Sequence, residues 1–479
     1  MLKKLFSHTA IYGLAPQISK VASLFALPII TAHLTATDYG VYGVITAVVG
    51  SISVLSYLGL NMILSNSFFK SPKQYKWAWR QIYGFLILWN IPYAFGLAAV
   101  IYSFIPVEAA EHTWQIIFLN TVPVVFFGPT AMIAVMYYQL RQEPFQIAIR
   151  GALIGLLTVG LNIYFIAGLK LGYMGWFLAG SISTMITQVS YWFPLNKTIK
   201  ITPIFNFKWR LIKNQLRISL PTVPHYYGAY LLNTSDRVIM KFLNISTGNI
   251  GLYNAANTMG NIVSIVANAS GQAIGPMLLQ SYRKKDEYLT RRLCYILQVA
   301  FFLGTFLLSM WLKEIFFLLI KNETLNKVYP LGIIIVMAYN YRPMYFAANN
   351  RLFYYEKTKV LIKVTFAAGL LNVILNLLLM PIWGYQVAAY TTFACLMYMG
   401  YAGFFLKEFK ATAQLNYHPL KWLGLSILLT VAAYYAVHLP VFVKIGLSVL
   451  MTGATYFLIK KLNSLTPVKT PVEAVLKHS

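Results

Sequence analysis

The sequence predicts an all-α polytopic membrane protein with about fourteen transmembrane helices. Of its 479 residues, 58% are hydrophobic and only 11% are charged, whereas a soluble domain carries about 25% charged residues. Long apolar runs recur from one end of the chain to the other, and no long polar segment separates them. A very large buried core would need such polar segments to cover it, so we expect the apolar runs to cross a membrane.

The apolar runs have the length of a membrane-spanning helix, which is about 20 residues. In chain order they are residues 9–32, 41–65, 82–105, 114–138, 145–167, 171–194, 214–241, 250–279, 293–318, 329–350, 360–381, 384–406, 420–438 and 441–459. Lys3 and Lys4 precede a first run that is long enough to remain as a spanning helix, so we expect no cleavable signal peptide.

The formal net charge of +27 has a topological explanation. Lysine and arginine gather in every second connection: at the N-terminus, at 70–80, at 141, and at 197–217, 283–292, 351–359, 407–421 and 460–477. The connections between them hold only Lys170, Lys321 and Lys327. The positive-inside rule therefore places both termini and the basic connections in the cytoplasm, and we expect no nucleic-acid partner.

Motifs of soluble enzymes are missing from the sequence. It contains no GxxxxGK[ST] or HExxH motif and no pair of carboxylates in one predicted helix. Cys294 and Cys395 lie in or beside apolar runs and suggest neither a disulfide nor a metal site. We therefore expect no catalytic residue, no cofactor and no bound metal.

The chain contains an internal repeat with an offset of 211 to 214 residues. The matches are Leu34–Tyr42 with Leu243–Tyr253, Gly128–Pro129 with Arg342–Pro343, Gly155–Asn162 with Gly369–Asn376, and Gly172–Tyr173 with Gly384–Tyr385. The repeat predicts a six-helix lobe at 1–200, a second at 201–410, and a C-terminal helix pair with a cytoplasmic tail at 411–479. Because six is even, both lobes enter the membrane in one orientation, as in transporters with the substrate path between their halves.

A polar stripe marks the eighth predicted span. It consists of Asn254, Asn257, Asn261, Ser264, Asn268 and Gln272, and steps of three and four residues keep it on one helix face. In a membrane such a face meets water, substrate or another helix. The corresponding positions of the first lobe are also small or polar, and small-residue helix packing is the alternative interpretation of this pattern. Four asparagines are too polar for packing alone, so we expect Asn254, Asn257, Asn261 and Asn268 to line a cavity.

These features resemble a known family. The segment Ser235-Asp236-Arg237, a short turn and then Gly251-Leu-Tyr253-Asn-Ala is similar to the seventh-helix region of bacterial O-antigen and capsular polysaccharide flippases. The segments Thr37–Gly40 and Asn372–Gly384 carry the resemblance too. This family belongs to the multidrug/oligosaccharidyl-lipid/polysaccharide exporter superfamily, and the resemblance extends over the whole chain.

The resemblance implies two six-helix bundles around a central cavity lined by cations. It implies a multi-pass protein of the bacterial inner membrane that moves an undecaprenyl-pyrophosphate-linked oligosaccharide by alternating access. Expected partners are a polysaccharide polymerase and a chain-length regulator. The alternatives are a peptidoglycan lipid-precursor flippase, then a cation-coupled multidrug exporter; the latter is disfavoured because the first lobe has no carboxylate within the membrane. A membrane-embedded polymerase or glycosyltransferase is the alternative from another class.

Three cations are candidates for binding the substrate pyrophosphate. Lys20 lies about twelve residues into the first span, near mid-membrane, where a lysine costs about 2.5–3.5 kcal/mol on insertion scales. Arg342 stands beside Pro343, whose ring frees a carbonyl one turn earlier. With Arg237 these residues are expected to hold pyrophosphate across the lobe interface. The structural alternatives are hydrogen bonds from Lys20 and Arg342 to free carbonyls.

Asp236 and Arg237 are adjacent, so their side chains diverge by about 100° and are not expected to pair directly. As the single deeply placed carboxylate, Asp236 is the candidate for coupling transport to protons or sodium, with a salt bridge to another helix as the alternative. Arg150 and Lys363 lie near the cytoplasmic face in equivalent helices. They are candidate substrate contacts, with snorkelling to lipid phosphate as the alternative.

Overall fold

The computed structural model describes residues 21–464, and every regular element in that range is a helix. The chain forms two compact units that do not follow the sequence order. Unit 1 comprises the described part of Met1–Ala255 together with Phe317–Val328 and Val373–Val387. Unit 2 comprises Ala256–Phe316, Tyr329–Asn372 and the described part of Ala388–Ser479. The predicted boundaries at 200 and 410 stay a prediction.

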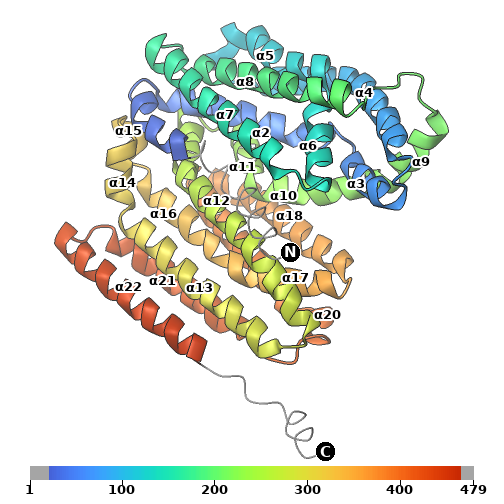
Figure 1. The fold of residues 1–479 in the computed structure, drawn as a ribbon. Coiled ribbons are helices and arrows are strands. Elements are labelled where there is room, and N and C mark those ends of the chain that lie inside the picture. The colour runs from blue at the N-terminus through green and yellow to red at the C-terminus, as the bar shows by residue number, and fades with distance from the viewer. Residues whose placement is uncertain (1–20, 465–479) are drawn as a thin grey trace, which may run out of the picture. The chain divides into compact units, whose positions relative to one another are not determined.

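Unit 1 contains the helices of the first half of the chain (Figure 1). After the helix Val21–Thr31 they are α2 (Ala36–Ser53), α3 (Leu60–Lys70), α4 (Tyr75–Phe104), η1 (Val107–His112), α5 (Thr113–Phe127), α6 (Thr130–Leu140), α7 (Pro144–Asn162), η2 (Ile163–Gly168), α8 (Tyr173–Phe193), η3 (Pro194–Thr198), α9 (Trp209–Ser219), η4 (Leu220–Thr222), α10 (Val223–Asn233), α11 (Ser235–Phe242) and the short α15 (Glu323–Asn326).

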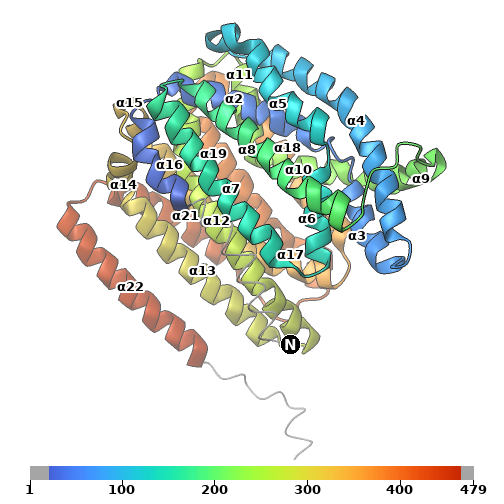
Figure 2. The same ribbon diagram turned by 45° about the horizontal axis from the view of Figure 1, so that its top comes forward.

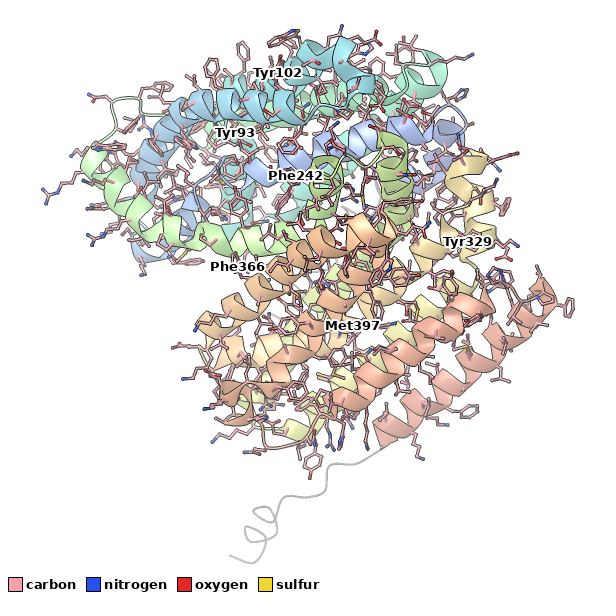
Figure 3. The ribbon with its side chains drawn as sticks, turned by 180° about the vertical axis from the view of Figure 1, so that it is seen from behind. Tyr93, Tyr102, Phe242, Tyr329, Phe366 and Met397 are labelled. Carbon is pink, nitrogen blue, oxygen red and sulfur yellow. The ribbon has the colours of Figure 1, made fainter. Side chains whose placement is uncertain are left out.

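Helices α4, α5, α7 and α8 pack side by side in unit 1. Along α4, Tyr93 is buried and Tyr102 is exposed, so the helix has a packed side and an open side (Figure 3). The predicted span 114–138 is broken rather than straight, because α5 and α6 meet at 55°. The break falls at Gly128 and Pro129: Gly128 adopts a φ of 52°, and proline cannot supply an N–H to continue the helix.

The start of α2 is fixed by its own sequence. The Thr35 hydroxyl accepts from the Asp38 N–H, and the Asp38 carboxylate accepts from the Thr35 N–H, which is a capping box. The same carboxylate also accepts from the Tyr173 N–H at 2.9 Å, and this bond joins the start of α2 to the start of α8. The Thr37–Gly40 motif therefore begins a helix and holds a second one.

Helices α2 and α12 (Thr247–Arg283) come into backbone contact near their first turns, within unit 1. A Cβ on Gly40 would lie 1.9 Å from the Thr247 carbonyl oxygen, and a Cβ on Gly251 would lie 1.7 Å from the Ala36 carbonyl oxygen. Gly40 and Gly251 are the repeat-related glycines identified in the sequence. The contact is therefore reciprocal: each glycine lies against the backbone of the other helix.

Unit 2 contains most of the second half (Figure 2). Its helices are α13 (Glu287–Met310), α16 (Tyr329–Ala338), η5 (Tyr339–Tyr341), α17 (Arg342–Tyr354), η6 (Ala402–Phe405), α20 (Lys407–Lys410), α21 (Pro419–Ala436) and α22 (Val441–Ser464). Four helices have residues in both units: α12, α14 (Leu312–Leu319), α18 (Thr358–Trp383) and α19 (Val387–Tyr401).

In unit 2, α13 packs against α16, α17, α21 and α22. Two buried cations of this unit form ion pairs between helices. Arg351 pairs with Glu287 and donates to the Thr412 carbonyl oxygen at 2.6 Å, which ties α17 to α13 and to the loop before α21. Lys444 of α22 pairs with Glu314 of α14 at 2.7 Å. Removing one partner of such a pair leaves a buried charge, so both pairs fix helix positions.

Seven helices in the described range are long and apolar enough to cross a membrane, or eight if α5 and α6 form one bent span. The all-helical, multi-pass prediction is confirmed, whereas the number fourteen stays a prediction. Several predicted spans are broken: 41–65 into α2 and α3, 214–241 into α9, α10 and α11, and 329–350 into α16, η5 and α17. A hydropathy window detects apolar length and is insensitive to such breaks.

Candidate functional site

A buried polar cluster lies where α11 and α12 begin, in unit 1. Thr234 has a φ of −138°, which ends α10 and lets α11 start anew at Ser235. Asp236 then falls in the first turn of α11 and Lys241 in its last turn, which suits the helix macrodipole. Asp236 is 2% exposed and Arg237 is 8% exposed, so both charges depend on protein partners.

The two oxygens of the Asp236 carboxylate accept hydrogen bonds from two different helices. Tyr253 of α12 donates its hydroxyl to Oδ2 at 2.5 Å, and Asn376 of α18 donates from Nδ2 to Oδ1 at 2.8 Å. Tyr253 and Asn376 are themselves buried. Both carboxylate oxygens are therefore bonded within the protein, as buried polar groups require.

Arg237 lies against the same helix, α12, where it contacts Asn254 and the ring of Tyr253. Its Nε donates to the Asn254 Oδ1 at 2.9 Å, and its Cζ lies 5.7 Å from the centre of the Tyr253 ring. Asn254 in turn donates from Nδ2 to the Tyr39 carbonyl oxygen of α2 at 3.2 Å. The structure thus brings Asp236, Arg237 and Asn254 into one cluster.

Tyr253 and Asn376 belong to this cluster, although the sequence analysis did not assign them a role. A signal existed for both: Tyr253 belongs to the motif after Gly251, and Asn376 is an amide within an apolar span and closes the repeat match to Gly155–Asn162. A polar group at such depth is costly unless it is bonded, which makes it a candidate site residue.

The remaining asparagines of the stripe lie farther along α12. Asn257 is half-buried, and Asn261 and Asn268 are exposed. The opposite side of this part of α12 packs within unit 2, where a Cβ on Gly260 or Gly271 would meet Ile335 or Phe346 at 2.4 Å. The helix therefore has one tightly packed side and one polar side.

Neither Arg150 nor Lys363 takes part in the hydrogen bonds of this cluster described above. Arg150 donates from Nη1 to the Gln146 carbonyl oxygen at 2.7 Å, and its Cζ lies 5.0 Å from the ring centre of Tyr191. Lys363 is exposed on α18. Lys20 lies outside the residues that the structure describes.

Arg342 begins α17 in unit 2. Its Cζ lies 5.2 Å from the ring centre of Tyr341 and 5.9 Å from that of Phe346. Its Nε is buried and has no hydrogen-bond acceptor within the described part of the chain. Stacking on aromatic rings orients the guanidinium and leaves donors for another acceptor.

An apolar groove of about 370 Å³ runs between α13, α21 and α22 in unit 2. Val299, Leu303 and Leu425 are among its lining residues, together with Trp422 and Leu458. The three helices lie side by side in Figure 1. A groove of this composition suits a hydrocarbon chain.

Three solved structures with a similar fold are a flippase and two transporters. The lipid II flippase MurJ, in an inward closed conformation, aligns with a TM-score of 0.65 at 12% identity, over 89% of this chain and 97% of that chain. An outward-facing multidrug resistance transporter of the MATE family, from the MOP superfamily, aligns with a TM-score of 0.55 at 14% identity, over 86% and 96%. A MOP superfamily transporter from Pyrococcus furiosus aligns with a TM-score of 0.55 at 12% identity, over 91% and 97%.

At these identities the likeness shows the fold, which is that of the MOP exporters. No curated protein matches the sequence. The family model described as "Polysaccharide biosynthesis protein" matches residues 5–282, which is more than half of the chain. The resemblance recognised in the sequence is therefore confirmed, and this multi-pass membrane protein belongs to the polysaccharide biosynthesis protein family.

Proposed function

We propose that this protein is a flippase that moves an undecaprenyl-pyrophosphate-linked oligosaccharide across the bacterial cytoplasmic membrane by alternating access. The oligosaccharide is the repeat unit of an O-antigen of lipopolysaccharide, a capsule or an exopolysaccharide. The protein transports this unit and catalyses no covalent step. Both termini lie in the cytoplasm, and a polysaccharide polymerase and a chain-length regulator act on the released product.

The observation that carries the proposal is the apolar groove between α13, α21 and α22 in a member of a polysaccharide biosynthesis family. A soluble sugar gains nothing from such a groove, whereas a polyprenyl tail can pack against its apolar side chains. Each methylene group transferred from water to an apolar surface contributes about 0.8 kcal/mol, so a long tail is held most favourably by apolar side chains or by lipid.

The pyrophosphate is the part of the substrate that hydrocarbon excludes most strongly. Arg237 is buried and Arg342 is half-buried, and each offers a guanidinium group. Lys20 adds an ammonium group in the first predicted span. Arginine binds phosphate through two parallel N–H donors, which offsets the hydration that the phosphate loses. Arg150 and Lys363 are the candidates for a first contact with the substrate near the cytoplasmic face. The polar side of α12, with Asn257, Asn261 and Asn268, suits the hydroxyl groups of the sugars.

Asp236 is the proposed ion-coupling residue. Its carboxylate is buried, and the Tyr253 and Asn376 donors can both reorient: the Tyr253 hydroxyl rotates, and the Asn376 amide can present its oxygen instead of its nitrogen. A proton or sodium ion bound at Asp236 would then replace these donors. The resulting loss of charge would change the contacts between α11, α12 and α18.

Two other cargoes are the alternatives. A peptidoglycan lipid precursor is favoured by the fold likeness to the lipid II flippase, and it carries the same polyprenyl-pyrophosphate group. A cationic drug is favoured by the likeness to the MATE transporters, but it would need an anionic wall rather than Arg237 and Arg342.

Complementation tests the proposal and separates these cargoes. The gene is expressed in three strains: one lacking its O-antigen flippase, one depleted of its lipid II flippase, and one lacking drug exporters. We expect surface polysaccharide to return in the first strain only, with a fall in the lipid-linked oligosaccharide that accumulates in the inner leaflet. Rescue of the second strain alone would assign the peptidoglycan precursor, and drug resistance alone would assign the exporter function.

A further inference from the structure

A strongly basic surface outside the proposed transport path lies on unit 1, around α9 and the turn between α3 and α4. We name it the basic platform, and its defining cations are Lys70, Lys73, Lys208, Arg210, Lys213 and Arg217. All six are exposed. Residues 60–82 and 194–222, which build this surface, contain no aspartate or glutamate. The positive charge is therefore not neutralised within the surface.

The connection that leads to α9 is held rigidly on α4. The Lys208 N–H donates to the Gln81 Oε1 at 2.7 Å, and Arg80 Nε donates to the Thr202 carbonyl oxygen at 2.9 Å. In the reverse direction, the Ile204 N–H donates to the Arg80 carbonyl oxygen at 3.0 Å. A Cβ on Gly84 would lie 2.0 Å from the Ile204 carbonyl oxygen, so the two segments are in backbone contact. The platform is thus a fixed surface rather than a loose linker.

Helix α9 has two distinct sides. Ile212 is completely buried in the core cluster that contains Trp79, and Leu216 packs against the same cluster. Away from this buried face, Ile218 is 57% exposed, and at the start of the helix Trp209 is 57% exposed although its ring centre lies 6.1 Å from that of Phe85 in the cluster. The Lys208 Nζ lies 5.5 Å from the ring centre of Trp77, which is also exposed. Exposed aromatic rings between cations are typical of surfaces that lie in a membrane interface.

The position of the basic platform indicates which kind of partner it binds. It surrounds the first turns of α4, a helix of 30 residues that is long and apolar enough to cross a membrane, and α9 lies beside α3 at this end of α4 (Figure 1). The end of a spanning helix lies at the level of the lipid headgroups, where anionic phospholipids are concentrated. We propose that the basic platform binds the headgroups of anionic phospholipids and so anchors α9 in the membrane interface. An acidic protein would match the charge but would not account for the exposed Trp209 and Ile218.

Fluorescence quenching in lipid nanodiscs tests this inference on the full chain. A fluorophore is attached to Asn214→Cys, an exposed position on α9; Cys294 and Cys395 are both buried, so labelling is selective. The nanodiscs contain equal amounts of phosphatidylglycerol and phosphatidylcholine, and one of the two is brominated. We expect brominated phosphatidylglycerol to quench about twofold more than brominated phosphatidylcholine, and high salt to reduce the difference.

The charge-neutral variant, in which Lys70, Lys73, Lys208, Arg210, Lys213 and Arg217 are all replaced by glutamine, should lose the preference. A matched variant in unit 2, Arg283→Gln/Lys284→Gln/Lys285→Gln, should retain it. All of these side chains are exposed, so size-exclusion profiles should not change.

Equal quenching by the two lipids in the parent protein would overturn the inference, as would a preference that survives in the charge-neutral variant. Equal quenching together with a response of the label to soluble polyglutamate would assign the platform to an acidic protein instead. Since no transport is measured, these outcomes are independent of the cargo.

Discussion

Asp236 and Arg237 show how two opposite charges that are adjacent in sequence are stabilised separately. Asp236 accepts from Tyr253 and Asn376, whereas Arg237 donates to Asn254 and lies over the Tyr253 ring. Tyr253 therefore serves both charges, through its hydroxyl group and through its ring. A change at Asp236 can alter α12 without moving the Arg237–Asn254 contact directly.

Replacing Asp236 by asparagine should uncouple transport from the ion gradient while the protein still folds. Asparagine has nearly the same shape and can still form hydrogen bonds with Tyr253 and Asn376, but it cannot take up a proton at neutral pH. Export of glycan by Asp236→Asn should fall and lose its dependence on pH or sodium. Normal export at every pH and sodium concentration would show that Asp236 has no coupling role. Glu143→Gln, a partly exposed carboxylate paired with Arg141, is the matched control and should behave as the parent protein.

Tyr253→Phe should destabilise the protein by removing one donor to a buried carboxylate. Hydrogen bonds to charged groups contribute about 1.5–3 kcal/mol, and the phenyl ring still fills the space. Thermal unfolding in detergent should show a lower midpoint for Tyr253→Phe. Tyr102→Phe, on an exposed ring of α4, should leave the midpoint unchanged. An unchanged midpoint for Tyr253→Phe would mean that its hydroxyl does not stabilise Asp236.

At this scale, sequence reasoning selected Asp236, Arg237 and Asn254 because charges and amides are rare in apolar spans. It could not select Asn376 as the partner of Asp236, because the two residues are 140 positions apart and only the fold brings them together. It also placed Arg150 and Arg342 among substrate contacts without showing that both rest on aromatic rings. The Tyr191 ring beside Arg150 comes from another helix, which the sequence could not bring to it, whereas Tyr341 and Phe346 lie one and four residues from Arg342 and were within reach of sequence reasoning.

At the scale of elements, the crossing of α2 and α12 depends on glycine. Gly40 and Gly251 each lie on the backbone of the opposite helix, so neither position has room for a side chain. The internal repeat predicted that these two helices are equivalent. That equivalent glycines would touch the opposite helix could not be predicted, because a repeat specifies similarity and not contact.

Gly40→Ala and Gly251→Ala should therefore force α2 and α12 apart. The added methyl groups would lie 1.9 Å and 1.7 Å from carbonyl oxygens, and overpacking of this kind costs about 1–3 kcal/mol. Thermal unfolding should show lower midpoints for both variants. Gly180→Ala in α8, with no neighbouring atom within 4 Å of its added Cβ, is the control and should be neutral or slightly stabilising. Equal midpoints for all three variants would contradict the close crossing.

At the scale of the whole molecule, composition and hydropathy were sufficient to predict an all-helical multi-pass membrane protein, whereas the family was recognised from the resemblance of short motifs. The exact path through the membrane was not predictable from hydropathy, because breaks such as Gly128–Pro129 lie inside continuous apolar runs. The distribution of charge remains the argument for topology, since neighbouring connections differ so strongly in their content of lysine and arginine.

Cysteine labelling should place the basic connections on the cytoplasmic side. Lys284→Cys should react with a membrane-impermeant maleimide only after cells are opened, because positive-inside orientation puts residues 283–292 in the cytoplasm. Glu111→Cys, in a connection predicted to lie outside, should react in intact cells; the Glu111 side chain is 78% exposed. The native Cys294 and Cys395 are buried and should give little background. Labelling of Lys284→Cys from outside intact cells would reverse the predicted orientation.

Transport of the proposed cargo requires positive charge wherever the pyrophosphate passes through hydrocarbon. Lys20, Arg237 and Arg342 are the proposed carriers of that charge, and charge should matter more than side-chain shape. Lys20→Arg should retain partial export, because the ammonium is replaced by another cation. Lys20→Ala and Arg342→Ala should abolish export in a flippase-null strain at normal protein levels. Lys327→Ala, an exposed cation in a connection predicted to lie outside, is the control and should export normally. If Lys20→Ala and Arg342→Ala both complement the strain fully, the pyrophosphate is stabilised by other groups.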